Sequence, residues 1–324
     1  MPAVAVVMPV LNEENYLEAA VLAILSQDYA GPIQVVLALG PSADRTNEVA
    51  ARIIAGDSRV SSVQNPTGRT PEGLNAALAA TTQEIVVRVD AHSELSDGYI
   101  RLAVETLQRT GADNVGGIMG ARGVTNFERA VAAAMTSPLG VGSASFHTGG
   151  QEGPAETVYL GVFKRSALER VGGYDPAFTR AQDWEMNHRI RATGGTVWFN
   201  PELFVTYRPR PSVGKLAKQY FEYGRWRRVV SRRHEGTINY RYLAPPFTVI
   251  GVASSLILGA VVSPILFVPA LVYALFILIA SARIGKSLGE FVSLPLILLT
   301  MHMTWGIGFL TSPKSLAPAV TLRP

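Results

Sequence analysis

Three successive segments near the C-terminus contain no charged residue, and few folds accommodate so much uncharged chain. They comprise residues 247–262, 264–282 and 291–311. Their lengths lie around the ~17–25 residues that a helix needs to cross a bilayer, and the first is compatible with a short, tilted or re-entrant helix. The alternative is a buried helical hairpin, but little chain remains to cover it. We therefore expect about three transmembrane helices over residues 243–312, followed by a tail, 313–324.

A basic block precedes these apolar segments. Residues 208–241 contain ten Lys and Arg against two Glu, a local charge of +8, whereas the whole chain carries +4, so the remainder carries about −4. Such a block beside an apolar tail indicates membrane lipids with anionic headgroups, and no nucleic acid, as the partner. Three crossings would place the polar turn of Arg283 and Lys286 on the same side as the N-terminal domain, in agreement with the positive-inside bias.

The start of the chain and its cysteine content bound the compartment and the chemistry. Residues 1–14 lack a basic region, and their apolar run is too short for a signal peptide. We therefore expect the first domain on the cytoplasmic side of the membrane. The chain has no cysteine, which excludes disulfides, cysteine-ligated zinc and thiol catalysis.

The first two thirds of the chain alternate short apolar runs with stretches of helical apolar spacing. Strands are expected at residues 4–8, 33–39, 60–63 and 85–89, and helices at residues 13–27, 44–54, 71–80 and 99–110. This alternation predicts an α/β fold with a mostly parallel sheet covered on both faces.

The alternation weakens after residue 114. There the pattern predicts a long loop over residues 138–154, strands at 157–163, 197–199 and 204–207, and a helix at 183–192. We place one domain over residues 1–210 and a basic amphipathic juxtamembrane segment over residues 211–242.

Polar groups follow three of the predicted strands. Asn12 and Glu13 come after the first strand, residues 40–46 after the second, and Asp90 and His92 after the fourth. Singly, these groups are explained by a helix cap, an ordinary turn and a surface turn. Ligands of open α/β sheets bind at the carboxyl ends of the strands, so together they predict one binding site at this edge.

Four blocks of sequence resemble family 2 glycosyltransferases of the GT-A fold, a Rossmann-like architecture. The blocks, in chain order, are VAVVMPVLNEENYLEAAVLAILSQ, ADRTNEVA, VVRVDAHSEL and LGVFKRSALERVGGYDPAFTRAQDWEMNHRIRATGG. The resemblance covers about residues 3–210. The D-A-H variant and the hydrophobic tail are most similar to the succinoglycan-type glucosyltransferase subgroup of bacterial polysaccharide synthesis.

The resemblance implies a metal site and a catalytic base. The diphosphate of a nucleotide-sugar donor is usually neutralised by a divalent cation. Asp90 and His92 match the metal-binding signature, and the imidazole favours Mn²⁺ slightly over Mg²⁺. Asp183 matches the base that takes the acceptor proton, and Glu185 is the reserve candidate. The alternative for Asp183 is a first-turn carboxylate that stabilises its helix.

The resemblance also implies donor contacts. Their expected positions are Pro9, Asn12, Glu13, Asp44, Arg69, Asn75 and Asp90. The sequence departs from the family pattern in having Leu39 and Gly40 where an acidic pair commonly holds the nucleotide, with Asp44 as the nearest acid.

A basic aromatic segment follows the family-like region. Residues 223–228 resemble the motif that covers the donor diphosphate in processive relatives, without its usual glutamine, and Arg225 and Arg228 are its candidate diphosphate contacts. An amphipathic helix lying on anionic lipid explains the segment equally well.

The predicted function is transfer of a hexose, with inversion, from a nucleotide sugar to a lipid-linked or glycan acceptor at the bacterial inner membrane. The product would serve cell-envelope or exopolysaccharide synthesis. One alternative is a degenerate GT-A domain that acts as a membrane scaffold or partner-binding module. A nucleotidyltransferase is a second alternative, but it would normally carry a glycine-rich loop after the first strand, where this chain has PVLNE.

Overall fold

The computed structural model describes residues 1–316 and divides the chain into two compact units. The sheet unit comprises Met1–Gly120 and Gly149–Tyr207. The helical unit comprises Ala121–Thr148 and the described chain from Arg208 onward. Residues 121–148 thus group with the apolar helices, whereas the sequence analysis had assigned them to the first domain.

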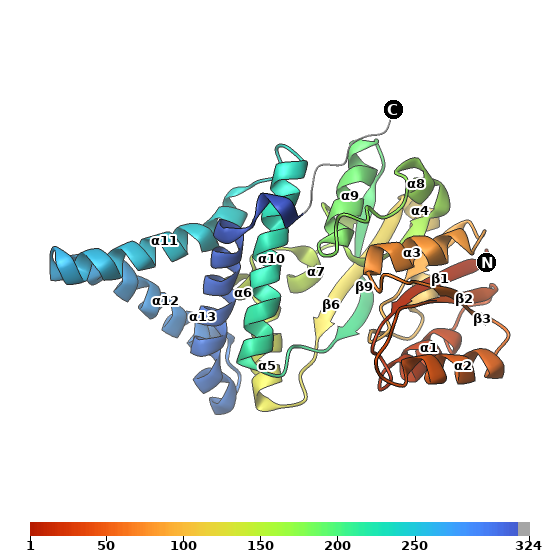
Figure 1. Cartoon of the computed structure of the whole chain (residues 1–324), viewed down its shortest axis with the longest axis horizontal. Coiled ribbons are helices and arrows are strands. Elements are labelled where there is room, and N and C mark those ends of the chain that lie inside the picture. The colour runs from red at the N-terminus through yellow and green to blue at the C-terminus, as the bar shows by residue number, and fades with distance from the viewer. Residues whose placement is uncertain (317–324) are drawn as a thin grey trace. The chain divides into compact units, whose positions relative to one another are not determined.

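A mixed nine-stranded sheet forms the centre of the sheet unit, in the order β3-β2-β1-β4-β8-β6-β9-β5, with β7 paired to β9 (Figure 1). The strands are β1 (Val4–Val10), β2 (Ile33–Leu39), β3 (Val60–Gln64), β4 (Ile85–Arg88), β5 (Glu94–Leu95), β6 (Asn114–Ala121), β7 (Gly153–Pro154), β8 (Tyr159–Lys164) and β9 (Val197–Tyr207). The strands β3, β2, β1 and β4 are parallel, and β8 joins them antiparallel. The α/β fold is confirmed, and antiparallel pairs join β8 to β4 and β6, and β5 and β7 to β9.

Helices cover both faces of this sheet. They are α1 (Leu17–Leu25), α2 (Thr46–Gly56), α3 (Thr70–Ala79), α4 (Tyr99–Thr110), α8 (Arg165–Arg170) and α9 (Gln182–Ala192). Alternate residues of β1 enter different cores: Val6 packs in the core that includes α1, α2 and α4, and Val7 packs in the core that includes α3 and α9. Burial on both faces explains the continuous apolar runs of the parallel strands.

The second half of the sheet was predicted less well. The strand β6 was missed because its glycines interrupt the apolar pattern, yet a Cβ atom on Gly117 would lie 1.9 Å from the carbonyl oxygen of Leu203. Glycine therefore permits this close backbone approach. The two strands expected at 197–199 and 204–207 are the single strand β9. The expected loop 138–154 contains three short elements, α6 (Pro138–Val141), α7 (Ser145–Thr148) and β7.

The helical unit is assembled around one apolar helix. Its longer helices are α5 (Asn126–Met135), α10 (Val213–Arg233), α11 (Tyr240–Val261), α12 (Val268–Ile284) and α13 (Leu288–Thr311), with single turns η1 (Pro264–Phe267) and η2 (Lys314–Leu316). The helix α13 packs against α5, α10, α11 and α12, most extensively against α10 (Figure 1).

Two glycines allow α10 and α13 to approach closely. A Cβ atom on Gly224 would lie 1.9 Å from the carbonyl oxygen of Trp305, and one on Gly308 would lie 2.1 Å from that of Phe221. Only residues without a side chain fit at such a crossing, as at the small-residue contacts of membrane helices.

Within residues 1–316, three helical segments are long and apolar enough to cross a membrane, as predicted. They are Tyr240–Val261, Pro264–Ile284 and Leu288–Thr311, with mean hydropathies of 1.7, 2.6 and 1.5. In the most apolar stretch of each segment, the buried share is 17% for the first, 17% for the second and 39% for the third. Exposed apolar surface of this extent argues against a buried hairpin in a soluble protein.

The glycine crossing predicts a specific loss of stability. Gly224→Ala should lower the free energy of unfolding by roughly 1–3 kcal/mol, because the added methyl group forces α10 away from α13. The matched control is Gly214→Ala on the same helix, where a Cβ atom meets nothing within 4 Å. Thermal unfolding in detergent measures both variants. Equal melting temperatures would contradict the close crossing.

Candidate active site

The loops after β1 and β2 are joined by side chain to backbone hydrogen bonds. The Oδ1 atom of Asn12 accepts a bond from the Ala43 amide at 2.8 Å, and the Asn12 amide donates to Oγ of Ser42 at 3.0 Å. The Glu13 amide donates to Oγ1 of Thr46 at 2.7 Å. The predicted convergence of these two strand ends is present, and these contacts hold the two loops at one edge of the sheet.

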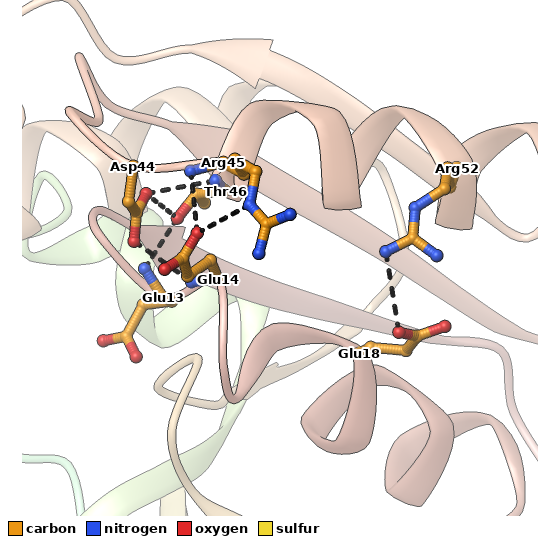
Figure 2. A network of polar contacts seen from close by, with 7 residues as sticks. All are labelled: Glu13, Glu14, Glu18, Asp44, Arg45, Thr46 and Arg52. Atoms are coloured by element: carbon orange, nitrogen blue, oxygen red, sulfur yellow. Dashed lines mark hydrogen bonds and ion pairs between the residues drawn. The ribbon is translucent and has the colours of Figure 1, made fainter.

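Asp44 organises the loop after β2. Its carboxylate accepts bonds from the amide and hydroxyl groups of Thr46 and from the Glu14 amide, and Figure 2 shows this network. The hydrogen bond from the Thr46 hydroxyl is the main cause that lowers the pKa of Asp44. Asp44 is therefore engaged at the start of α2, and its predicted contact with the donor remains a prediction.

His92 and Glu13 lie together at the end of β4. The Nδ1 atom of His92 is 2.8 Å from Oε1 of Glu13. An ionised carboxylate can only accept, so Nδ1 carries the proton and the imidazole ring is oriented by Glu13. The His92 side chain is 40% exposed and that of Glu13 is 16% exposed. The structure thus links the signature histidine to the loop after β1.

Arg88, which was not among the predicted site residues, connects the two carboxylates expected to carry the chemistry. Its guanidinium donates to Oδ1 of Asp90 at 3.1 Å and to Oδ1 of Asp183, the second residue of α9. The Arg88 side chain is only 5% exposed, whereas those of Asp90 and Asp183 are 21% and 23% exposed. The guanidinium carbon also lies 5.8 Å from the centre of the Tyr174 ring. One buried cation therefore fixes two partly exposed carboxylates.

Burial and this cation set the charges of the site. Burial opposes ionisation of Asp90, but Arg88 and then His92 outweigh it and lower its pKa. Burial raises the pKa of Asp183 to about 6, with a further contribution from Asp90 and against the opposing effect of Arg88. Although burial disfavours its charge, Asp183 and Asp90 hold the pKa of Arg88 above its ordinary value. At neutral pH Arg88 and Asp90 are charged and Asp183 is mostly ionised.

Backbone strain is concentrated around these groups. Among the described residues, only three that are not glycine have a positive φ: Asn12 at 57°, Leu160 at 58° and Ala181 at 59°. Asn12 precedes Glu13, and Ala181 precedes α9 and its Asp183. The Leu160 amide hydrogen-bonds to Asp183 and contributes to lowering its pKa. Strained conformations of this kind are typical of functional sites.

Glu185, the reserve candidate for the base, lies in a different environment. Its side chain is 2% exposed, and its two carboxylate oxygens accept bonds of 2.7 Å from Arg189, one turn later in α9. Arg189 also donates to the carbonyl oxygen of Val171. A carboxylate buried against a fixed guanidinium is a poor proton acceptor. This geometry favours a structural role for Glu185, and its role as the reserve candidate for the base remains a prediction.

Two of the residues predicted to contact the donor, Asn75 and Arg69, make structural interactions, and their donor contacts remain predictions. Asn75 uses its amide nitrogen and oxygen on the main chain of Tyr174, at 2.7 and 2.8 Å. Arg69 donates to the carbonyl oxygen of Pro176 at 2.7 Å and pairs with Glu72 at 2.9 Å. Pro9 lies within β1, one residue further than the predicted strand reached. Asn75 in particular supports the loop before α9, which explains its position without a ligand.

Arg225 and Arg228 belong to the helical unit. Arg225 pairs with Glu222 at 2.8 Å, and the guanidinium carbon of Arg228 lies 5.1 Å from the centre of the Phe309 ring. Both residues are on α10, within the predicted basic segment. Their contacts join α10 to itself and to α13, and their diphosphate contacts remain predictions.

The candidate metal ligands of this site suit a cation that is also coordinated by a substrate. Among the described residues, no three His, Asp or Glu side chains are grouped to hold a metal. Asp90 and His92 supply one carboxylate and one imidazole at the same strand end. Mg²⁺ and similar ions are commonly held by one or two carboxylates together with substrate phosphates. The residues therefore suit a cation completed by a diphosphate.

The glycosyl transferase family 2 model matches residues 5–172. The chain belongs to glycosyltransferase family 2. The chain is 31% identical over 310 residues to the succinoglycan biosynthesis protein ExoA of Rhizobium meliloti (strain 1021), covering 94% of this chain and 93% of that protein. Membership and this relative together make the chain a glycosyltransferase of polysaccharide biosynthesis.

Two further proteins resemble almost the whole chain. One is a Methanococcus voltae dolichyl N-acetyl-α-D-glucosaminyl phosphate 3-β-D-2,3-diacetamido-2,3-dideoxy-β-D-glucuronosyltransferase, 23% identical over 94% of this chain and 95% of that protein. The other is the solved structure of the mannosyltransferase PcManGT from Pyrobaculum calidifontis, in complex with GDP-Man and Mn²⁺. Its TM-score is 0.67 at 21% identity, covering 96% of this chain and 87% of that one. This similarity supports the GT-A fold.

The bridge through Arg88 predicts coupling between two substitutions. Arg88→Met leaves Asp90 and Asp183 without their cation. Removing one partner of a buried ion pair costs ~3–5 kcal/mol, and less is expected here because both carboxylates are partly exposed. The double variant Arg88→Met/Asp183→Asn should recover part of the loss, because one unpaired charge is removed. Thermal unfolding of Arg88→Met, Asp183→Asn and the double variant measures the coupling, and strictly additive losses would contradict the bridge.

Proposed function

We propose that this glycosyltransferase moves a hexose from a nucleotide sugar to a lipid-linked acceptor, with inversion at the anomeric carbon. The observation that carries the proposal is the juxtaposition of Asp90 and Asp183 through Arg88. The arrangement offers a phosphate-side carboxylate and an acceptor-side carboxylate at fixed separation. A single displacement with one base requires these two groups.

The donor side of the site is assigned to Asp90, His92 and Glu13. Asp90 and the Nε2 atom of His92 would hold Mn²⁺ or Mg²⁺, because Nδ1 is bonded to Glu13. The cation would neutralise the charge that develops on the leaving diphosphate. Glu13 orients the imidazole ring, as carboxylates commonly do beside metal-binding histidines. The PcManGT complex with GDP-Man and Mn²⁺ supports this assignment for a protein of the same fold.

Asp183 is assigned as the base. The acceptor hydroxyl oxygen attacks the anomeric carbon as the bond from that carbon to the diphosphate oxygen breaks, and the hydroxyl proton passes to Asp183. A pKa of about 6 leaves this carboxylate mostly ionised at neutral pH while keeping it more basic than a solvated aspartate. Arg88 and the Leu160 amide fix its position.

A membrane-associated acceptor is supported by two observations. The helical unit exposes the apolar side chains of α11 and α12, which suit a bilayer. The relative from Methanococcus voltae acts, by its name, on a dolichyl-phosphate-linked sugar, which is a lipid-linked acceptor. A polyprenyl-linked acceptor at the bacterial inner membrane follows as the proposal.

A donor screen tests the proposed function. Detergent-solubilised full-length protein is incubated with a panel of nucleotide sugars and a membrane lipid extract. Transfer of a hexose into the lipid fraction, with nucleoside diphosphate released, is the expected result. Neither transfer nor donor hydrolysis with any sugar nucleotide would favour the scaffold alternative.

Asp183→Asn should separate the base from a helix-stabilising residue. The amide preserves shape and hydrogen bonding but accepts no proton, so kcat should fall by ~10²–10⁴ with donor binding little changed. The wild-type rate should fall as the pH drops through about 6, because protonated Asp183 cannot act as a base.

Glu185→Gln is the matched control on the same helix. It weakens the pair with Arg189 and should lower thermal stability, while turnover below the melting temperature stays within a few-fold of wild type. Near-normal turnover of Asp183→Asn would remove this residue from the mechanism.

Metal removal tests the donor side. A chelator should abolish transfer, and Mn²⁺ or Mg²⁺ should restore it. Asp90→Ala should be inactive, whereas Glu13→Gln should mainly raise the Mn²⁺ concentration needed for half-maximal rate, by about 10–100-fold. Full activity of Asp90→Ala in the presence of chelator would exclude the assigned metal site.

A further inference from the structure

The end of α13 is bonded to the end of α10. The guanidinium of Arg232 donates to the carbonyl oxygens of Ser312 and Pro313 at 2.7 and 3.1 Å. The hydroxyl of Ser312 donates to the carbonyl oxygen of Arg225 at 3.0 Å. These bonds hold the last residues of both helices at one place.

The two helices also run in the same direction. Phe221 contacts Gly308, Arg225 contacts Ser312 and Arg232 contacts Pro313, so position along α10 rises with position along α13. Figure 1 shows the two helices side by side in the helical unit. The start of α11 also lies against α13, because a Cβ atom on Gly306 would be 2.6 Å from the carbonyl oxygen of Pro245.

This arrangement constrains the number of membrane crossings. If α11, α12 and α13 each crossed the bilayer, three crossings would separate Arg232 from Pro313, and the two residues would lie on opposite faces. Their hydrogen bond requires the same face. The number of crossings between them is therefore even, and at least one of the three apolar helices does not cross.

The surroundings of α13 identify it as that helix. It lies along α10, which carries Glu222, Arg225 and Arg228, and its first turn lies beside Asn126 of α5. Charged groups beside a spanning helix would be brought into the hydrocarbon, where they are costly. By contrast, α11 and α12 expose apolar side chains up to the connection between them, where Val261, Val262 and Ile265 are 74%, 69% and 69% exposed.

The exposed side chains of α13 form a single stripe. Apart from Phe291 near the start of the helix, they recur at steps of three, four or eight residues, which bring them back to one helix face. The members are Leu288, Val292, Leu296, Leu299, Ile307 and Leu310. The opposite face, with Leu294, Leu298 and Met301, is buried within the helical unit. A helix with one buried face and one exposed apolar stripe suits the surface of a bilayer.

We infer that only the α11–α12 hairpin enters the bilayer, and that α13 lies along the membrane surface with its apolar stripe in the lipid. The partner of this stripe is the interfacial layer of the bilayer beneath α10 and its arginines. With 22 residues in α11 and 21 in η1 and α12 together, each arm is ~32 Å long and sufficient for the hydrocarbon core. The inference rests on the proposed membrane association and changes the expected three crossings.

Because the chain has no cysteine, single cysteines can be placed without background. Three exposed positions are used, Lys218→Cys on α10, Lys286→Cys before α13 and Lys314→Cys after it, together with the partly exposed Ser263→Cys in the hairpin connection. A membrane-impermeant maleimide is applied to sealed vesicles of both orientations. Lys218→Cys, Lys286→Cys and Lys314→Cys should react in vesicles of one orientation. Ser263→Cys should not react in those vesicles.

Two labelling results would overturn the inference. Reaction of Lys314→Cys only in vesicles of the opposite orientation to Lys218→Cys would mean that α13 crosses. Reaction of Ser263→Cys together with Lys218→Cys would mean that the hairpin stays outside the bilayer. Carbonate extraction of the same membranes reports separately on membrane association, so loss of the full-length protein to the supernatant would reject that part of the proposed function instead.

Depth measurements provide a second readout that does not depend on sidedness. Spin labels at Val292→Cys, Leu299→Cys and Leu310→Cys should report the same depth to within a few ångströms, because a surface helix keeps its stripe at one level. A spanning helix would instead separate the first and last labels by ~27 Å along its axis. A depth profile that passes through the bilayer centre would contradict the surface placement.

Discussion

The salt bridges of Arg88 are the interaction on which the site depends. A guanidinium in a central strand is unfavourable unless its charge is compensated, and Asp90 and Asp183 provide that compensation. The same pairing draws the first turn of α9 onto the end of β4. The two carboxylates carry opposite roles in the proposed reaction, and a common cation keeps their separation constant. Arg88 thus serves the fold and the chemistry through one set of contacts.

The sequence was most informative where burial dictates composition. The strands β1, β2 and β4 are apolar on both faces, and the polar residues that follow them meet at one sheet edge, as Glu13 and His92 illustrate. Arg88 was missed because VVRVD was interpreted as an apolar strand, although a charged residue inside a buried strand is itself a signal that a partner exists. Asp90 is two residues away, but the second partner, Asp183, is 95 residues away, and no local pattern identifies it.

Hydropathy predicted the apolar helices but not their packing. Length and composition make α13 equivalent to α11 and α12, yet α13 shares its surface with α10 through Gly224 and Gly308. A glycine within a helical sequence does not by itself indicate a close contact between helices. Its role as a contact can be recognised only when the facing backbone is known. The basic residues of α10 were assigned to lipid or diphosphate, and in the structure part of their bonding is to α13.

The missing acidic pair after β2 has a steric explanation. A Cβ atom on Gly40 would lie 3.0 Å from a methyl carbon of Leu11 and 3.2 Å from the Cα atom of Gly68, which itself has φ of 64°. The loops after β1, β2 and β3 therefore pack against one another where family members commonly carry a carboxylate. The oxygens of Asp44, the nearest acid, are bonded at the start of α2, and its contact with the donor remains a prediction. In the proposed reaction, the position of Gly40 therefore offers main-chain groups and packed loops to the nucleotide in place of a carboxylate.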